Sequence, residues 1–392
     1  MQDKNMFKTI TKTHFFLSPL TRKTATYNSL LAEVLRRATP SFPTTKKLEN
    51  KLQELYSAKI SFSTYKRGET HVIAASLEQV ADEFLPEPIA EISGNILNEA
   101  VFNQTSFNHE YVEQEKANLK LRIAAIINNK AQYAQKRCIE EMFGDNPYAI
   151  NSDGYADIID GITPEGLYDY YKNTFLNLPY ATFTSNDETV SVIPNDLPPL
   201  NFPMLPIAKA KNITEKEDLN QSKLSMGFTT GIGSDEEHDY FILTVFNAIF
   251  GGSPYSKLFN NVREKLSLAY SVSSQVERFK GAIFVNAGID ANGFKPAYDE
   301  IIKQLDEIKN GNFTESEISA AKEGITNNLK SICDMQFAYQ DFLLRQHLAG
   351  RPTDEQIEQI INGVNNVTKD EICDIAKRMQ LHTVFLLEGS VS

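Results

Sequence analysis

The stretch GGSPYSKLFNNVREKLSLAYSV occupies residues 251–272 and indicates the fold more clearly than any other part of the chain. Its two leading glycines predict a tight turn, because glycine adopts backbone angles that other residues avoid. Leu258, Phe259 and Val262 then follow at spacings of one and three, which fits one face of a helix. A strand is expected from Ala269 onward, so the stretch predicts a turn, a helix and a strand in succession.

A second feature is a repeat at a constant distance along the chain. The segment at residues 107–116 (FNHEYVEQEK) matches residues 313–322 (FTESEISAAK), which lie 206 positions further on. The same shift relates Tyr133 to Tyr339 and Gly144 to Gly350. A near-equal shift relates the threonine-capped helix starts at 162–164 (ITP) and 367–369 (VTK). A series of matches at one distance indicates two copies of one α/β unit.

The joint between the copies is expected where the composition changes. Residues 191–212 contain five prolines and little periodicity, which is typical of a semi-extended linker. The sequence therefore predicts an N-terminal domain at 1–190 and a C-terminal domain at 213–392. With 392 residues, the chain has a length that suits two domains of this size.

The expected elements define the fold class. Hairpins are expected at 59–65 with 70–76 and at 269–277 with 282–289, where apolar residues alternate. Helical periodicity covers the ranges 24–38, 44–56, 80–100, 109–130, 132–143, 164–175, 236–250, 294–309, 315–331, 336–348 and 369–379. Hairpins combined with runs of helices predict an α+β fold, with helices packed on one face of an antiparallel-rich sheet in each copy.

The stretch at 251–272 resembles the C-terminal-domain signature of the pitrilysin/insulinase-like metallopeptidases, the inverzincins, in their small bacterial two-domain form. The resemblance extends over nearly the whole chain and is clearest at residues 251–290. In that family the arginine and tyrosine of the signature, here Arg263 and Tyr270, help to hold a substrate peptide at a zinc site. The resemblance also implies a clam-shaped dimer that closes around a substrate chamber.

The family's zinc site lies on a His-x-x-Glu-His helix in the N-terminal domain, and this chain lacks the motif. The matching slot is residues 28–39 (NSLLAEVLRRAT), where Ser29 and Glu33 stand in the places of the two histidines. Ala32 stands in the place of the glutamate that acts as general base. Glu115 resembles the family's downstream third ligand, although by itself it is expected to be a solvated helix residue. A serine and a lone carboxylate do not replace two imidazoles, so no metal and no other cofactor is expected.

A different zinc site is not indicated by the remaining residues. No two of the histidines lie within five residues of each other, and none lies beside a cysteine, so metal-ligand spacings are absent; these histidines are His14, His71, His109, His238, His347 and His382. His14 and His71 fall in apparent strands, where we expect structural roles.

Composition excludes several classes of protein. A net charge of −12 without a basic cluster argues against a nucleic-acid partner. No run approaches the ~18 apolar residues of a membrane span, and the N-terminus lacks the pattern of a signal peptide. The three cysteines, Cys138, Cys333 and Cys373, are scattered, which is typical of reduced thiols and predicts a cytoplasmic protein.

Arg263 and Tyr270 have two interpretations. In the structural one, Arg263 pairs with a neighbouring carboxylate and the Tyr270 ring packs in the sheet. In the functional one, Arg263 offers a fork of donors to a peptide carbonyl or carboxylate and Tyr270 offers a directional hydroxyl. Neither side chain activates water, so the pair can assist hydrolysis without performing it.

The sequence thus predicts a protein that is inactive alone. The leading hypothesis is a non-catalytic subunit that pairs with a zinc-bearing paralogue, which carries His-x-x-Glu-His, and contributes Arg263 and Tyr270 to the binding of an unfolded peptide. The alternative is a non-enzymatic homodimer that binds peptides or serves as a scaffold. An active zinc enzyme with rearranged ligands is a third possibility.

Overall fold

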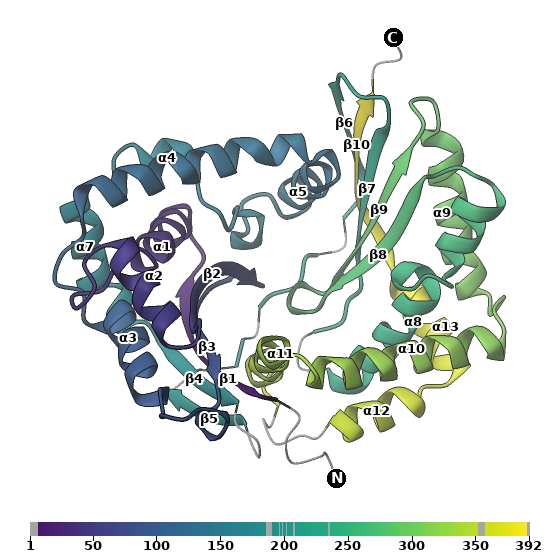
Figure 1. Cartoon of the computed structure of the whole chain (residues 1–392). Helices are drawn as coiled ribbons and strands as arrows, with labels where there is room; N and C mark the ends of the chain where they lie inside the picture. The colour runs from purple at the N-terminus through teal and green to yellow at the C-terminus, as the bar shows by residue number, and fades with distance from the viewer. Residues whose placement is uncertain are drawn as a thin grey trace. The chain divides into compact units, whose positions relative to one another are not determined.

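The computed structural model describes residues 7–185, 190–195, 197, 199–200, 202–206, 208–233, 236–351 and 357–389. The chain divides into two compact units that do not follow the chain order strictly. Unit 1 comprises residues 1–125, 150–198 and 332–348, and unit 2 comprises residues 126–149, 199–331 and 349–392. Each unit contains one five-stranded sheet with helices packed against it (Figure 1).

The sheet of unit 1 is antiparallel throughout and has the strand order β2-β3-β1-β4-β5. Its strands are β1 (Thr9–Pro19), β2 (Lys59–Arg67), β3 (Thr70–Val80), β4 (Tyr180–Ser185) and β5 (Val190–Asn195). One face, which includes Phe16 and Ile73, forms a core with helices. The helices of this unit in the first half of the chain are α1 (Arg22–Leu35), α2 (Thr45–Glu54), α3 (Ala90–Phe102), α4 (His109–Ala125), α6 (Ala156–Ile159) and α7 (Pro164–Asn173).

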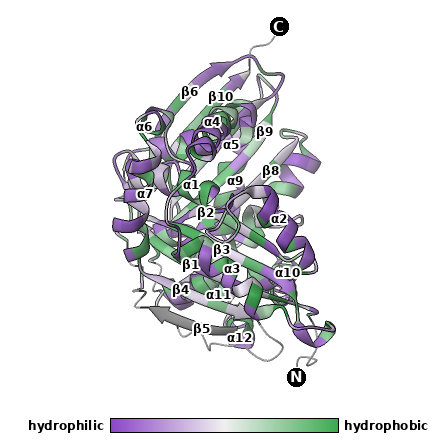
Figure 2. Ribbon diagram, turned by 60° about the vertical axis from the view of Figure 1, so that its left-hand side comes forward, coloured by the Kyte–Doolittle hydropathy of each residue, from purple (hydrophilic) through white to green (hydrophobic). Residues whose placement is uncertain are grey.

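The sheet of unit 2 has the order β6-β10-β7-β9-β8. Its strands are β6 (Lys211–Glu217), β7 (Ser222–Thr229), β8 (Ser271–Glu277), β9 (Ala282–Ile289) and β10 (Gln380–Gly389), and only the β6–β10 pair is parallel. Edge strand β6 is mostly hydrophilic (Figure 2), as suits a strand with one unpaired side. Its helices include α8 (Glu237–Asn247), α9 (Phe294–Lys309), α10 (Glu315–Cys333), α12 (Ile357–Asn365) and α13 (Lys369–Arg378).

Two helices are exchanged between the halves of the sequence. Helix α5 (Lys130–Phe143) comes from the first half but belongs to unit 2, where Ala134, Cys138 and Met142 join a core with Phe284 and Phe385. Helix α11 (Gln336–Leu348) comes from the second half but packs on β1 and β4 of unit 1. The compact units therefore differ from the ranges 1–190 and 213–392, because each exchanged helix buries its apolar face on the other half's sheet. The predicted linker range 191–212 contains the end of β5 and the start of β6.

The two units share details that an internal duplication predicts. Four neighbouring strands follow the same order in both sheets. Counted from the β8 edge, the sheet of unit 2 runs β8-β9-β7-β10, which corresponds to β2-β3-β1-β4 in unit 1. Lys116 Nζ donates to the carbonyl of Ile162 at 2.8 Å, and Lys322 Nζ, 206 positions later, donates to the carbonyl of Val367 at 2.7 Å. Gly144 and Gly350, which follow the exchanged helices, both have positive φ (55° and 75°).

Some expected helix boundaries are wrong. The range 80–100 does not form one helix: β3 extends to Val80, a single 3₁₀ turn covers Asp82–Phe84, and α3 starts only at Ala90. Pro86 and Pro88 explain the break, since proline lacks the N–H group and restricts the residue before it. The expected helix 109–130 likewise ends at Ala125, and Asn129 caps the start of α5.

No helix in the described part of the chain is long and apolar enough to cross a membrane.

Candidate functional site

Helix α1 carries the degenerate metal motif and is well defined locally. Thr21 caps its N-terminus by accepting a hydrogen bond from the backbone N–H of Thr24, and the Thr24 hydroxyl bonds back to Thr21, which completes a capping box. Its buried side includes Leu30, Leu31 and Leu35 in the unit 1 core. Capping and packing therefore hold the helix in place.

Ser29 lies fully buried on the inner side of α1. Its hydroxyl donates to the carbonyl of Ser152 at 2.9 Å and lies 3.3 Å from the hydroxyl of Thr64 on β2. Ala32, one turn later, is also buried. Ser29 thus connects α1 to the neighbouring strand and loop, and neither Ser29 nor Ala32 offers a strong metal donor.

Glu33 takes part in an ion-pair network. One carboxylate oxygen lies 2.6 Å from Nη1 of Arg122 on α4, and the other lies 3.0 Å from Nη2 of Arg36. Arg122 also approaches Asp153 at 3.4 Å. The α4 side chain that contacts Glu33 is therefore the cation Arg122. No pattern in the sequence predicted this contact.

Glu115 on α4 pairs with Arg37, which lies just beyond the C-terminal end of α1. Its side chain is only 3% exposed, accepts a 2.6 Å hydrogen bond from Nη1 of Arg37 and another from Asn118 at 3.1 Å. The expectation of a solvated glutamate is wrong, because Arg37 compensates the charge that burial would otherwise make costly. Glu33 and Glu115 have separate arginine partners, and no contact recorded for either one joins them.

These residues do not fit a zinc ion. Zinc requires several nitrogen, sulfur or carboxylate ligands at about 2.0–2.3 Å, and in the described ranges no group of three or more His, Cys, Asp or Glu side chains is placed to hold a metal. The carboxylate of Glu33 is already paired with two guanidinium groups, and a divalent cation beside it would face the charge of Arg122. The slot is a structural ion-pair network.

A loop at residues 152–154 supports this network and requires a glycine. Gly154 has φ of 89°, and a Cβ there would lie 2.5 Å from the Cα of Thr26 on α1. We expect Gly154→Ala to lower the free energy of unfolding by at least about 1–3 kcal/mol, the usual cost of a residue held in a strained conformation. Urea denaturation measures the effect.

Gly94→Ala is the matched control, because Gly94 lies within α3 and no atom lies within 4 Å of its added Cβ. It is expected to raise the free energy of unfolding by up to about 1 kcal/mol through helix propensity. Equal effects of the two substitutions would contradict the close approach of the loop to α1.

The signature stretch of unit 2 forms an unusual helix. Residues Ala248–Gly252 and Leu258–Lys265 are π-helical, a rare form that is frequent at functional sites. Gly252 ends the first of these segments, and a side chain would not fit there because a Cβ would lie 2.9 Å from the backbone oxygen of Asn247. The sequence predicted a helix at this place but carried no signal for its wider winding.

Arg263 and Tyr270 are both exposed side chains. The side chain of Arg263 is 44% exposed, its guanidinium lies 4.8 Å from the centre of the Phe259 ring, and its Nε is 3.4 Å from Glu264. Tyr270 is 57% exposed and donates a 2.8 Å hydrogen bond to Asp290. That hydrogen bond to the carboxylate raises the pKa of Tyr270. Their recorded contacts do not join the two side chains directly.

His14 and His71 are both buried in unit 1. His14 is in contact with Thr182 (2.8 Å) and His71 with Asn28 (3.3 Å), and both rings are buried. Burial is the main cause that lowers the pKa of each to about 4. Both are neutral structural residues at physiological pH.

Comparison with known proteins gives the context for this site. Residues 158–325 match the family described as "Peptidase M16 inactive domain". A Bacillus subtilis protein named "Probable inactive metalloprotease YmfF" is 35% identical over 409 residues, covering 98% of this chain and 94% of that protein. The "Uncharacterized zinc protease YmxG" of the same bacterium is 27% identical over 177 residues, 43% of this chain and 41% of that protein.

Solved structures of similar proteins share the fold of this chain. A conserved protein from Enterococcus faecalis superposes with a TM-score of 0.87 and 29% identity, covering 99% of this chain and 95% of that one. A "peptidase M16 inactive domain" from Pseudomonas fluorescens has the same fold, with a TM-score of 0.79, 17% identity, and coverage of 98% and 94%. The chain therefore belongs to the M16, or pitrilysin/insulinase-like, metallopeptidase family, and the resemblance found in its signature is confirmed.

Proposed function

We propose that this protein is a non-catalytic subunit of a peptidase made of two paralogous chains. The partner would supply the zinc site with its His-x-x-Glu-His helix, and this chain would supply Arg263 and Tyr270. The main support is one contrast: the slot on α1 holds an ion-pair network, whereas the side chains of Arg263 and Tyr270 are exposed. A subunit that assists a partner needs the second feature and not the first.

The chemistry of the two residues suits a peptide backbone. The Arg263 guanidinium presents several N–H donors in a fixed plane, which fits a carbonyl or carboxylate oxygen. Tyr270 remains neutral at physiological pH and can donate its hydroxyl hydrogen to a developing oxyanion after leaving Asp290. Most backbone carbonyls of a folded protein are already hydrogen-bonded, whereas an unfolded peptide offers accessible ones, so the proposed substrate is an unfolded peptide.

The test is peptidase activity in a mixture of this protein with its zinc-bearing paralogue. The wild-type pair is expected to cleave an unstructured fluorogenic peptide, and this protein alone is not. Arg263→Ala combined with Tyr270→Phe should lower kcat/KM of the pair by roughly 10²-fold or more, because removing one oxyanion donor costs about 10²–10³ in other enzymes.

Two exposed neighbours serve as controls. Tyr255→Phe and Lys265→Ala change the same types of group within the signature stretch, and both side chains are exposed. They are expected to leave kcat/KM of the pair within about twofold of wild type. Full activity of the Arg263/Tyr270 double variant in the pair would overturn the proposal.

A peptide-binding or scaffold homodimer is the second candidate, and a polar pocket in unit 1 favours it. The homodimer hypothesis predicts no cleavage in either sample, together with a stable dimer of this chain alone in analytical ultracentrifugation.

We also propose a cytoplasmic location, supported by three cysteines that lie as thiols on the separate helices α5, α10 and α13.

A further inference from the structure

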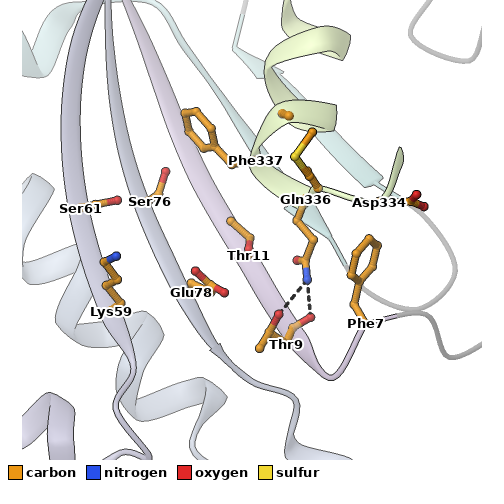
Figure 3. Close-up of a pocket in the computed structure, with 12 residues that line it drawn as sticks. Phe7, Thr9, Thr11, Lys59, Ser61, Ser76, Glu78, Asp334, Gln336 and Phe337 are labelled. Atoms are coloured by element: carbon orange, nitrogen blue, oxygen red, sulfur yellow. Dashed lines mark hydrogen bonds between the residues drawn. The ribbon is translucent and has the colours of Figure 1, made fainter. Parts of the chain in front are cut away.

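A pocket of about 490 Å³ opens within unit 1, between the sheet and the start of α11 (Figure 3). Its floor is the sheet face that α11 covers, formed by β1, β2 and β3, and its wall is residues 334–338. The aromatic residues Phe7 and Phe337 also line it. All these residues belong to unit 1, so the pocket does not depend on unit 2.

The floor carries charged and hydroxyl groups in register. Lys59 on β2 lies directly opposite Glu78 on β3, and Glu78 lies opposite Thr11 on β1, so all three share one row across the strands. Cross-strand neighbours of opposite charge commonly pair. Among the described residues, however, neither Lys59 nor Glu78 forms an ion pair, and both are exposed. Glu78 thus offers an unengaged carboxylate to the pocket.

Gln336 adds an acceptor of fixed orientation. Its Nε2 donates to the carbonyl and the hydroxyl of Thr9, at 2.7 and 3.0 Å (Figure 3). Turning the amide over would place its oxygen against the Thr9 carbonyl oxygen, so the Oε1 atom stays on the other side. The residue is only 9% exposed, and within the described ranges Oε1 is buried without a hydrogen-bond partner. A buried acceptor in this state favours any ligand that donates an N–H group.

The balance of groups defines the ligand. Among the described residues that line the pocket, Glu78 and Asp334 are carboxylates and Gln336 Oε1 is an acceptor, whereas Lys59 is the one cation. The rings of Phe7 and Phe337 add aromatic surface, which is favourable for cations. A ligand group with positive charge and several N–H donors matches this set, and an anion does not.

We propose that the pocket binds a positively charged group of an extended peptide, either its free α-amino end or a Lys or Arg side chain. The peptide nature of the ligand rests on the proposed function, whereas its charge follows from the pocket alone. Bound in this way, a basic group would anchor one end of a substrate on unit 1.

The experiment is calorimetric titration of this protein alone with three unstructured twelve-residue peptides of Gly, Ser and Ala. The first has a free amino end and no basic residue, the second is acetylated and contains one arginine, and the third is acetylated and neutral. One or both of the cationic peptides should bind at least about tenfold more tightly than the neutral one, which is the size of one charged hydrogen bond. The one that does identifies the source of the charge.

Two variants locate the binding. Glu78→Gln should lower the affinity for the more tightly bound cationic peptide by about tenfold or more and leave the affinity for the neutral peptide unchanged. Gln336→Met should also lower the affinity for the cationic peptide. Glu49→Gln, an exposed glutamate on α2, is the matched control and should change nothing. Thermal melting of each variant separates loss of binding from loss of fold.

Equal affinity for all three peptides, or unchanged binding by Glu78→Gln, would overturn the proposal. This outcome is distinct from failure of the proposed function, which is measured as activity of the pair and depends on Arg263 and Tyr270. If the pair loses activity in the double variant while Glu78→Gln binds the peptides normally, the proposed function stands and the proposed pocket ligand is overturned. If the double variant keeps full activity while Glu78→Gln loses binding of the cationic peptide, the proposed function is overturned and the cation-binding pocket stands.

Discussion

Lowering the pH from 7 to 4 should destabilise this protein by several kcal/mol, chiefly through His14 and His71. Burial lowers the pKa of each from 6.5 to about 4. Each neutral ring therefore contributes stability that is fully present above pH 6.5. That contribution is lost as the pH falls toward 4, because the unfolded chain then binds a proton that the folded chain does not. At 1.36 kcal/mol per pKa unit, each histidine accounts for roughly 3 kcal/mol.

The measurement is urea denaturation at several pH values between 7 and 4, repeated for His14→Gln and His71→Gln. Each substitution should reduce the loss of stability across this range, although each will also lower stability at pH 7. His109→Gln, which changes an exposed histidine, is the control and should retain the full pH dependence. A wild-type stability that is constant from pH 6.5 to 4.5 would show that the two rings are not buried as described.

A zinc site should appear when the ion-pair network on α1 and α4 is replaced by ligands. Ser29→His, Glu33→His and Arg122→Glu together place two imidazoles one turn apart on α1 and a carboxylate at the α4 position that contacts residue 33. This donor set suits zinc. We expect binding at about micromolar affinity or tighter, corresponding to about 8 kcal/mol, whereas the wild-type slot binds no zinc. Calorimetry and the zinc-dependent shift in melting temperature measure the change.

The control distinguishes two positions on α4. In a variant with only Ser29→His and Glu33→His, the sole α4 carboxylate suggested by the sequence resemblance is Glu115, which is engaged by Arg37, and Arg122 retains its charge. This variant should bind zinc at least about 100-fold more weakly, a difference of about 2.7 kcal/mol. Equal binding by both variants would identify Glu115 as a usable ligand. Absence of binding in both would mean that Ser29 and Glu33 are not the motif positions.

The sequence was most informative where the signal is local. Helical periodicity, alternating strands and threonine caps identified most elements of both units, and the shift of 206 residues identified their repetition. The capped helix starts at Thr163 and Thr368 follow this pattern, since a cap involves only residues three positions apart. The failure at residues 80–100 has a local cause as well: the prolines there outweigh the apolar pattern.

The candidate site was only partly predictable. The loss of both histidines and the general base is visible in residues 28–39, because it depends on residue identity alone. The pairing of Glu33 with Arg122 joins residues 89 positions apart, and that of Glu115 with Arg37 joins residues 78 apart. No periodicity reports which charged side chains meet across two helices, and the same limit applies to the row formed by Lys59, Glu78 and Thr11.

The sequence by itself determined the family, the duplication and the absence of a zinc motif, since each depends on which residues are present and how they are spaced. The tertiary structure decided the rest: the exchange of α5 and α11, the charge network that replaces the metal ligands, and the pocket beneath α11. An amphipathic helix specifies the face that it must bury, but several sheets in one chain can bury it. The choice among them is a property of packing over long sequence distances.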